Sequence, residues 1–198
     1  MFDIVELVKT VGYVGIFAIV FAESGLFFGF FFPGDSLLFT AGLLASQGFL
    51  DFYILAPLVF AGAVLGDTVG YMFGRKVGPA IFKNEDSLFF NKKNIERTKI
   101  FYEKYGSKTI ILARFVPIVR TFAPIFAGVG HMRYKTFLTY NLIGGALWGL
   151  GVTGIAYYLG SIIPNLERYL VPIVLLIIFV SLIPLALEYL AHRKNSKK

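Results

Sequence analysis

The chain has 198 residues and a mean hydropathy of +0.72, with 57% hydrophobic and 16% charged residues. A soluble domain of this size cannot hide so much apolar surface, because much of it would lie at the boundary with water. The absence of cysteine excludes a disulfide framework, a thiolate metal site and a cysteine nucleophile. The composition therefore predicts an integral membrane protein with one transmembrane domain over 1–198.

The net charge of +7 is concentrated in two clusters. Residues 75–108 hold nine basic residues against four acids, and the tail HRKNSKK at 192–198 adds four basic residues. Such clusters beside apolar segments are typical of cytoplasmic loops next to an anionic leaflet. Because no nucleic-acid recognition module is visible, we expect the lipid bilayer, and not a nucleic acid, as the partner.

The first apolar stretch, 11–32, runs into Pro33 and Gly34, which cannot continue a helix cleanly. The stretch that follows, 36–50, has about 15 apolar residues, which is short for a bilayer crossing. An apolar arm, a break and a short second arm predict a re-entrant hairpin. A helix from Ile4 onward either crosses the bilayer or lies flat on it.

The next apolar stretch, 52–73, carries Asp67 as its one charge and predicts a spanning helix. It leads into a polar cytoplasmic linker, 75–104. At 91–106 the apolar and aromatic side chains fall near one helical face, with basic residues elsewhere. This pattern predicts an amphipathic helix on the membrane surface, with a plain solvated helix as the alternative.

A second broken stretch covers 107–130, where two arginines and two prolines interrupt an apolar run. It predicts a second re-entrant hairpin, followed by spanning helices at 136–160 and 170–190. Lipid does not tolerate irregular backbone at membrane depth, so both breaks should face protein or a wet cavity. The predicted hairpin breaks are Pro33, Gly34, Pro117 and Pro124.

The two broken stretches resemble each other. A shift of 91 positions aligns 14–33 with 105–124 and matches Gly15, Ile19, Ala22, Phe31 and Pro33 with identical residues. Weaker matches follow, between 62–66 and 145–149 and between 70–74 and 156–160. The pattern predicts an inverted repeat, 14–74 and 105–160, in which each half is a hairpin plus one spanning helix. One span separates the hairpins, so they enter from opposite faces and meet near the midplane.

Charge placement agrees with this count of spans. With the basic tail inside, counting spans backwards puts 131–135 and 75–108 on the same side. We therefore expect a multi-pass protein of a bacterial or archaeal cytoplasmic membrane, with a cytoplasmic C-terminus. Glycines recur every four residues at 62, 66, 70 and 74, which indicates close helix packing and permits, without requiring, a homo-oligomer.

Four charges inside the apolar stretches are the candidate site, because ionisable residues at membrane depth are costly. Arg114 and Arg120 offer planar donors suited to a lipid phosphate. Glu23 and Asp35 straddle the first break, where they would couple protonation to gating. The structural alternative is that these acids pair with the arginines only to hold the hairpins together.

Three further residues are secondary candidates. Asp67 either caps backbone or joins the charged cluster, Asn141 suggests a polar contact between helices, and Trp148 suggests packing. An enzyme acting on the same lipids needs a nucleophile or a metal with a base. The two histidines, His131 and His192, lie away from any phosphatase motif, so we expect no enzyme, no metal and no cofactor.

Three segments carry a family resemblance: ESGLFFGFFFPGDSLL from residue 23, GRKVG at 74–78 and ARFVPIVRTFAPIFAG at 113–128. Together they resemble the signature of the DedA membrane-protein family, whose broad superfamily includes lipid scramblases of the endoplasmic reticulum. The resemblance implies two opposed re-entrant hairpins and transport of phospholipid or undecaprenyl phosphate. The family's important acids and arginines fall on the four charged candidates. The leading expectation is a flippase for undecaprenyl phosphate, with a general phospholipid scramblase or a small-ion or anion transporter as alternatives.

Overall fold

The computed structural model describes residues 4–26, 34–81 and 108–163, and every regular element within these ranges is helical. The chain order is α1 (Ile4–Gly25), α2 (Gly34–Ser46), α3 (Phe52–Ile81), α5 (Thr109–Ala113), α6 (Pro117–Val129), α7 (Tyr134–Gly145), the π-helical turn η2 (Ala146–Leu150) and α8 (Gly151–Ile162). The predicted all-helical class is confirmed for these ranges. The predicted amphipathic helix at 91–106 and the span at 170–190 lie outside the described residues.

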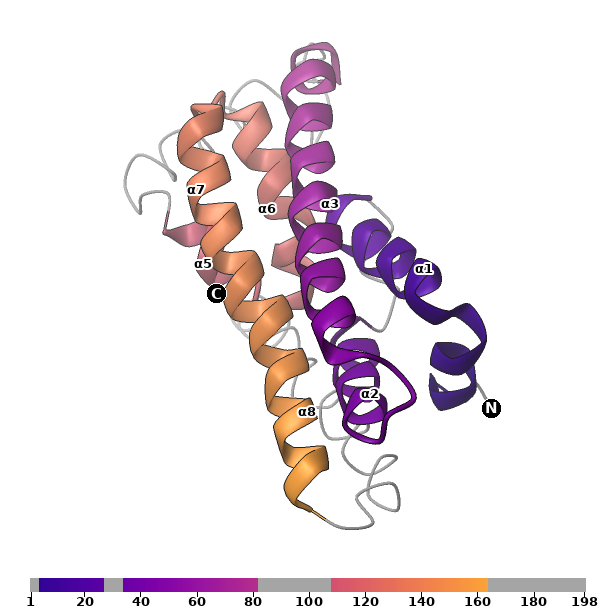
Figure 1. The fold of residues 1–198 in the computed structure, drawn as a ribbon. Helices are drawn as coiled ribbons and strands as arrows, with labels where there is room; N and C mark the ends of the chain where they lie inside the picture. The colour runs from indigo at the N-terminus through magenta and orange to yellow at the C-terminus, as the bar shows by residue number, and fades with distance from the viewer. Residues whose placement is uncertain (1–3, 27–33, 82–107, 164–198) are drawn as a thin grey trace, which may run out of the picture.

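Two long helices form the frame of the molecule (Figure 1). Phe52–Val77 within α3 and Tyr134–Ile162, which joins α7, η2 and α8, are both long and apolar enough to cross a membrane. They correspond to the spans predicted at 52–73 and 136–160.

The first broken stretch begins with a kinked helix. Gly12 has a φ of 55° inside α1, a left-handed conformation that glycine adopts without a Cβ clash. The helix then ends at Gly25, earlier than the arm of 11–32 that the sequence predicts. Gly34 is the first residue of α2, and Pro33 lies outside the described residues.

The second broken stretch shows what its prolines do. Val116 is extended, with φ −119° and ψ 108°, because the ring of Pro117 disfavours a helical residue before it. Pro117 then starts α6, where its missing N–H is not needed, so the predicted break there is confirmed. The predicted break at Pro124 is wrong, since α6 continues through it to Val129. Membrane helices tolerate an internal proline when neighbouring helices pack around it, and Pro124 is buried close to Gly70 of α3.

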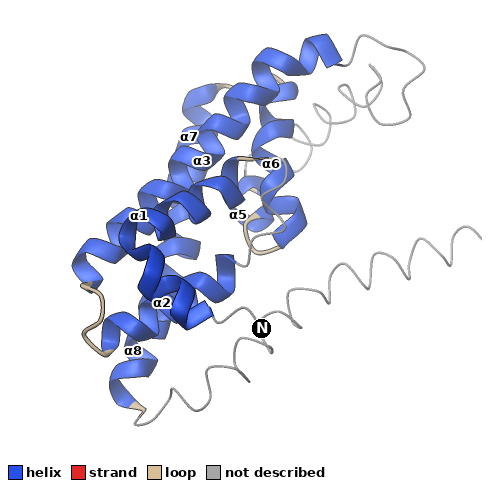
Figure 2. Ribbon diagram, turned by 90° about the vertical axis from the view of Figure 1, so that its right-hand side faces the viewer, coloured by secondary structure: helices blue, strands red, loops and turns tan. Residues whose placement is uncertain are grey.

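The helices pack in a definite set of pairs. Both α1 and α6 pack along α3, α2 packs along α8, and α5 packs on α7. Figure 2 shows α2 and α8 at one end of the molecule, with α3, α6 and α7 extending toward the other.

Glycines allow these contacts to be close. A Cβ added at Gly66 would meet the backbone of α1 at Phe21 and Gly25, and one at Gly74 would meet the Ile125 backbone of α6. A Cβ at Gly42 would meet the Thr153 carbonyl of α8. The predicted close packing at 62–74 is therefore confirmed.

The described helices expose several large apolar side chains and bury four charged ones. Val14, Tyr53 and Leu112 are 81%, 84% and 68% exposed. In contrast, the exposed fraction is at most 2% for the four charged residues Glu23, Asp67, Arg114 and Arg120. This inversion of the soluble pattern is expected where lipid is the outer solvent.

Candidate functional site: a buried arginine–carboxylate cluster

The buried charges form two groups. We call Arg114, Asp67 and Asn141 the Arg114 node, and Arg120, Glu23, Asp35 and Trp148 the Arg120 node. Together the two nodes draw side chains from α1, α2, α3, α6, α7 and η2, and from the turn that follows α5.

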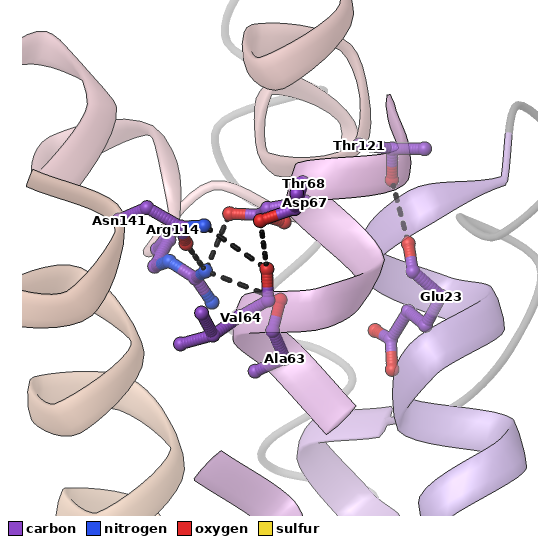
Figure 3. A network of polar contacts seen from close by, with 8 residues as sticks. All are labelled: Glu23, Ala63, Val64, Asp67, Thr68, Arg114, Thr121 and Asn141. Atoms are coloured by element: carbon purple, nitrogen blue, oxygen red, sulfur yellow. Dashed lines mark hydrogen bonds and ion pairs between the residues drawn. The ribbon is translucent and has the colours of Figure 1, made fainter. Parts of the chain in front are cut away.

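The Arg114 node joins the two long helices. Arg114 caps the C-terminus of α5, and its Nη2 donates to the Asp67 carboxylate of α3 and, at 2.5 Å, to Oδ1 of Asn141 on α7. Asn141 in turn donates to the Val64 carbonyl at 3.1 Å, and the Ala63 carbonyl lies 3.4 Å from Nη2. Figure 3 shows Arg114 held between these two helices. Each polar contact substitutes for water that the apolar surroundings exclude.

The Arg120 node joins the two broken stretches. Arg120 lies in the first turns of α6, and its guanidinium forks between Glu23 near the end of α1 and Asp35 at the start of α2. The Asp35 bond joins Nη1 to Oδ1 at 2.9 Å. On the same side of α6, the Thr121 hydroxyl donates to the Glu23 backbone carbonyl at 3.4 Å (Figure 3). A guanidinium has two terminal nitrogens that can each bind one carboxylate, so arginine suits this bridge between Glu23 and Asp35 better than lysine would.

Trp148 completes the Arg120 node from the second long helix. Its indole Nε1 donates to Oδ1 of Asp35 at 2.7 Å. Cζ of Arg120 lies 4.4 Å from the centroid of the indole, within the range of a cation–π contact. Trp148 therefore touches both the acid and the base of one ion pair.

Three of the four primary candidates meet directly, and Arg114 lies in the other node. Glu23 and Asp35 both bind Arg120, whereas Arg114 takes Asp67 as its carboxylate. Of the two alternatives for Asp67, joining the cluster is the one that the structure shows.

Asn141 makes the expected contact between helices, since it links Arg114 to α3. Trp148 is buried, but it is also a hydrogen-bond donor to the cluster, which the sequence did not indicate. Its one sequence signal is that it is the sole tryptophan of the chain, inside a glycine-rich segment.

Several polar atoms of the cluster are buried without a hydrogen-bond partner among the described residues. They are Glu23 Oε2, Asp67 Oδ1, Arg114 Nε and Nη1, and Arg120 Nε. Unsatisfied buried groups are rare in proteins and call for a ligand, a proton or ordered water. Over the described ranges, no group of three or more histidine, cysteine, aspartate or glutamate residues is arranged to hold a metal ion.

Comparisons with known proteins give the family. A model of the VTT domain matches residues 32–161, and protein DedA of Escherichia coli K12 is 45% identical over 198 residues, which covers 98% of this chain and 90% of that protein. The chain belongs to the DedA family of membrane proteins. Within the DedA family, the inner membrane protein YghB of the same organism is 33% identical over 82% of this chain and 74% of its own length.

An uncharacterized membrane protein of Mycobacterium leprae is 47% identical over 90% of this chain and 80% of its own length. No solved structure matches the chain. The VTT match includes Asp35, Asp67, Arg114, Arg120 and Trp148, and it begins after Glu23. The relatives are named as membrane proteins, which agrees with the two apolar helices of this DedA-family chain.

Proposed function

We propose that this DedA-family protein is a transporter that carries an anionic lipid phosphate across the cytoplasmic membrane. Undecaprenyl phosphate is the first candidate substrate. The observation that carries the proposal is the buried cluster, in which two guanidiniums lie among apolar helices. Guanidiniums bind phosphate oxygens through parallel hydrogen bonds. Arg114 has two nitrogens without a partner among the described residues, and Arg120 has one, so donors remain for such a ligand.

The charge of the cluster links anion binding to protons. Two arginines oppose three carboxylates, so the formal charge is −1 when every group is ionised. A phosphate that enters this cluster is repelled until a carboxylate takes up a proton and releases its arginine. Glu23 and Asp35 share one guanidinium, so these two acids are the proposed proton-coupling and gating residues, and Arg114 and Arg120 are the proposed phosphate ligands.

The packing supports an inverted repeat of two re-entrant hairpins as the transport frame. In each half, the first hairpin arm packs on the long helix of its own half: α1 on α3, and α5 on α7. The second arm packs on the long helix of the other half: α2 on α8, and α6 on α3. Each second arm makes its contact through a glycine: Gly42 of α2 approaches α8, and Gly128 of α6 approaches α3. Two similar gates on opposite faces are what alternating access requires.

The same frame orients the protein. Arg75 and Lys76 of α3 and Arg133 and Lys135 beside α7 are exposed, and positively charged flanks mark the cytoplasmic side. We place these ends and the C-terminus in the cytoplasm. The protein acts as a transporter without enzymatic chemistry, and its partner is the lipid bilayer.

A general phospholipid scramblase would use the same cluster without selecting one headgroup. A small-ion or anion transporter is a further candidate because the cluster is enclosed. Of its charged side chains, only Asp35 is substantially exposed, at 24%. An enclosed path suits an ion, whereas a lipid needs a groove that opens sideways to the membrane.

The first experiment is reconstitution in liposomes, with translocation of labelled undecaprenyl phosphate measured for the wild type, Arg114→Ala and Glu23→Gln. Lys135→Ala is the matched control, because it removes an exposed charge outside the cluster. Loss of transport in both cluster variants, each shown to be folded, with a normal control supports the proposal. Equal transport of unrelated phospholipids favours the scramblase, and the absence of any lipid movement under an imposed gradient favours ion transport.

A further inference from the structure

Trp148 belongs to the hydrophobic core, and its indole also contacts an ion pair. The indole is 2% exposed, and it comes from the second long helix to reach an ion pair formed between α2 and α6. Because an indole N–H is a donor only, it can satisfy a carboxylate oxygen but cannot replace the carboxylate as a partner of Arg120.

Both donors in this contact meet on one atom. Oδ1 of Asp35 accepts from Nη1 of Arg120 at 2.9 Å and from Nε1 of Trp148 at 2.7 Å. Asp35 is also the most exposed acid of its node, with 24% of its side chain accessible against 2% for Glu23. A partly exposed carboxylate would turn to water readily unless a second donor held it, and the indole supplies that donor.

The backbone that presents Trp148 is unusual. In η2 the N–H of Gly151 donates to the Ala146 carbonyl, five residues earlier, which is the π-helical pattern. An extra residue in a turn rotates the following side chains by about 100° relative to an uninterrupted α-helix. Gly145 and Gly149 flank the indole and lie against Val64 and Val59 of α3 respectively, so the wide turn still packs closely. Single π-helical turns inside α-helices are frequent at functional sites.

We propose that Trp148 is a positioning residue of the transport cluster: its indole N–H fixes Asp35, its ring backs Arg120, and it thereby ties the helix Tyr134–Ile162 to the gate between α2 and α6. This inference rests on the proposed function, since the step that Trp148 serves is transport. The residue acts through Asp35, and it need not touch the lipid.

The sole tryptophan of the chain makes a direct test possible. Excitation beyond the tyrosine band reports on Trp148 alone, whether or not any substrate is transported. We expect Asp35→Ala to shift the emission maximum of the full-length protein in detergent. The matched control is Asp51→Ala, which removes an exposed acid that caps α3, and its emission should equal that of the wild type. An Asp35→Ala spectrum identical to the wild type overturns the contact.

A second experiment measures transport after removal of the indole N–H alone. A tryptophan isostere with sulfur in place of the ring nitrogen, incorporated at position 148, keeps the shape and the stacking, and Trp148→Phe is the genetic counterpart. Loss of one hydrogen bond to a charged group corresponds to a roughly tenfold slower transport rate. Leu147→Ala, in the same turn but 54% exposed, should transport like the wild type.

A double-mutant cycle separates positioning from mere packing. In an Asp35→Ala background the isostere should cause no further loss of the free energy of unfolding or of the residual transport rate, because its target is already absent. Wild-type transport by the isostere variant, or an undiminished effect in that background, overturns the proposal. If the wild type moves no lipid, the proposed function fails, and the same cycle measured on unfolding in detergent still decides whether Trp148 and Asp35 are coupled.

Discussion

The Arg114 and Arg120 nodes each pair an arginine with at least one carboxylate, but they differ in the number and exposure of those carboxylates. Arg114 faces one carboxylate, and the side chains of that pair are each 1% exposed. Arg120 faces two carboxylates, one of which, Asp35, is 24% exposed. Among the described residues, Arg114 has two nitrogens without a hydrogen-bond partner, whereas Arg120 has one.

Under the proposed function, this difference indicates that the two arginines have different roles. The Arg114–Asp67 pair carries no excess charge, so the spare donors of Arg114 can bind a phosphate while Asp67 stays in place. The Arg120 node holds the excess negative charge and has a member that water reaches. Arg114 is therefore the anchor, and Arg120 is the arginine whose partner changes.

The largest expected effect comes from breaking the Arg114–Asp67 pair. Arg114→Met leaves Asp67 buried without its partner, and we expect the free energy of unfolding to fall by about 3–5 kcal/mol. Denaturant unfolding in detergent measures the loss. The double variant Arg114→Met/Asp67→Leu removes both charges and should recover most of the stability, while a single variant as stable as the wild type would contradict the role of the pair.

The second prediction compares lysine at the two arginine positions. A lysine at 120 cannot hold Glu23 and Asp35 with two separate nitrogens, so we expect Arg120→Lys to slow transport by roughly ten- to hundredfold. Arg114→Lys can still meet Asp67 and should be better tolerated in stability than Arg114→Met. Transport rates in liposomes and unfolding in detergent check both variants. Equal stability of Arg114→Lys and Arg114→Met would contradict the anchoring role of the Arg114–Asp67 pair.

The third prediction uses a glycine beside each node. An added Cβ at Gly144 would lie 2.8 Å from Cδ of Arg114, in the middle of a buried side chain, so Gly144→Ala should cost about 1–3 kcal/mol of stability. At Gly34 the Cβ would meet the carboxylate at the flexible end of Glu23, which would have to give up its contact with Arg120. Gly34→Ala should therefore affect transport more than stability.

Gly151→Ala is the control for both glycine variants. A Cβ there meets no atom within 4 Å, and alanine is a better helix former than glycine, by up to about 1 kcal/mol. Thermal unfolding should therefore show a neutral or slightly stabilised protein. The reverse order, with Gly151→Ala the least stable of the three, would show that local packing around the nodes is not what limits stability.

The smallest effect concerns pH. Anion entry into a cluster of charge −1 requires proton uptake, so wild-type transport should accelerate as pH falls. Glu23→Gln brings the formal charge of the cluster to zero, and the slope of its residual transport rate against pH should be shallower than that of the wild type. Rates across a pH series, with Glu23→Gln compared to Lys135→Ala, measure this change. Superimposable profiles would mean that Glu23 is not the coupling acid.

Much of the local structure was predictable because it follows from local chemistry. Runs of apolar residues predicted the helices of α3 and Tyr134–Ile162, and the restriction that a proline places on its predecessor predicted the break at Pro117. The break expected at Pro124 was wrong, since proline alone does not show whether a neighbouring helix supports it. Likewise, the first helix ends at Gly25. Glycine is a helix-stop signal, but the apolar run up to residue 32 contains more than one glycine, so hydrophobicity alone did not select this end.

By itself, the sequence determined that this is a helical membrane protein and which charges would be costly enough to need partners. Only the tertiary structure decided the pairing. Arg114 meets Asp67 across 47 residues, and Arg120 meets Glu23 and Asp35 across 97 and 85. Such contacts depend on how whole helices pack, whereas a sequence pattern reports hydrophobicity and backbone restriction within a few turns. For the same reason the sequence left Trp148 as a secondary candidate, and its contacts with Asp35 and Arg120 follow only from the packing of η2 beside α2 and α6.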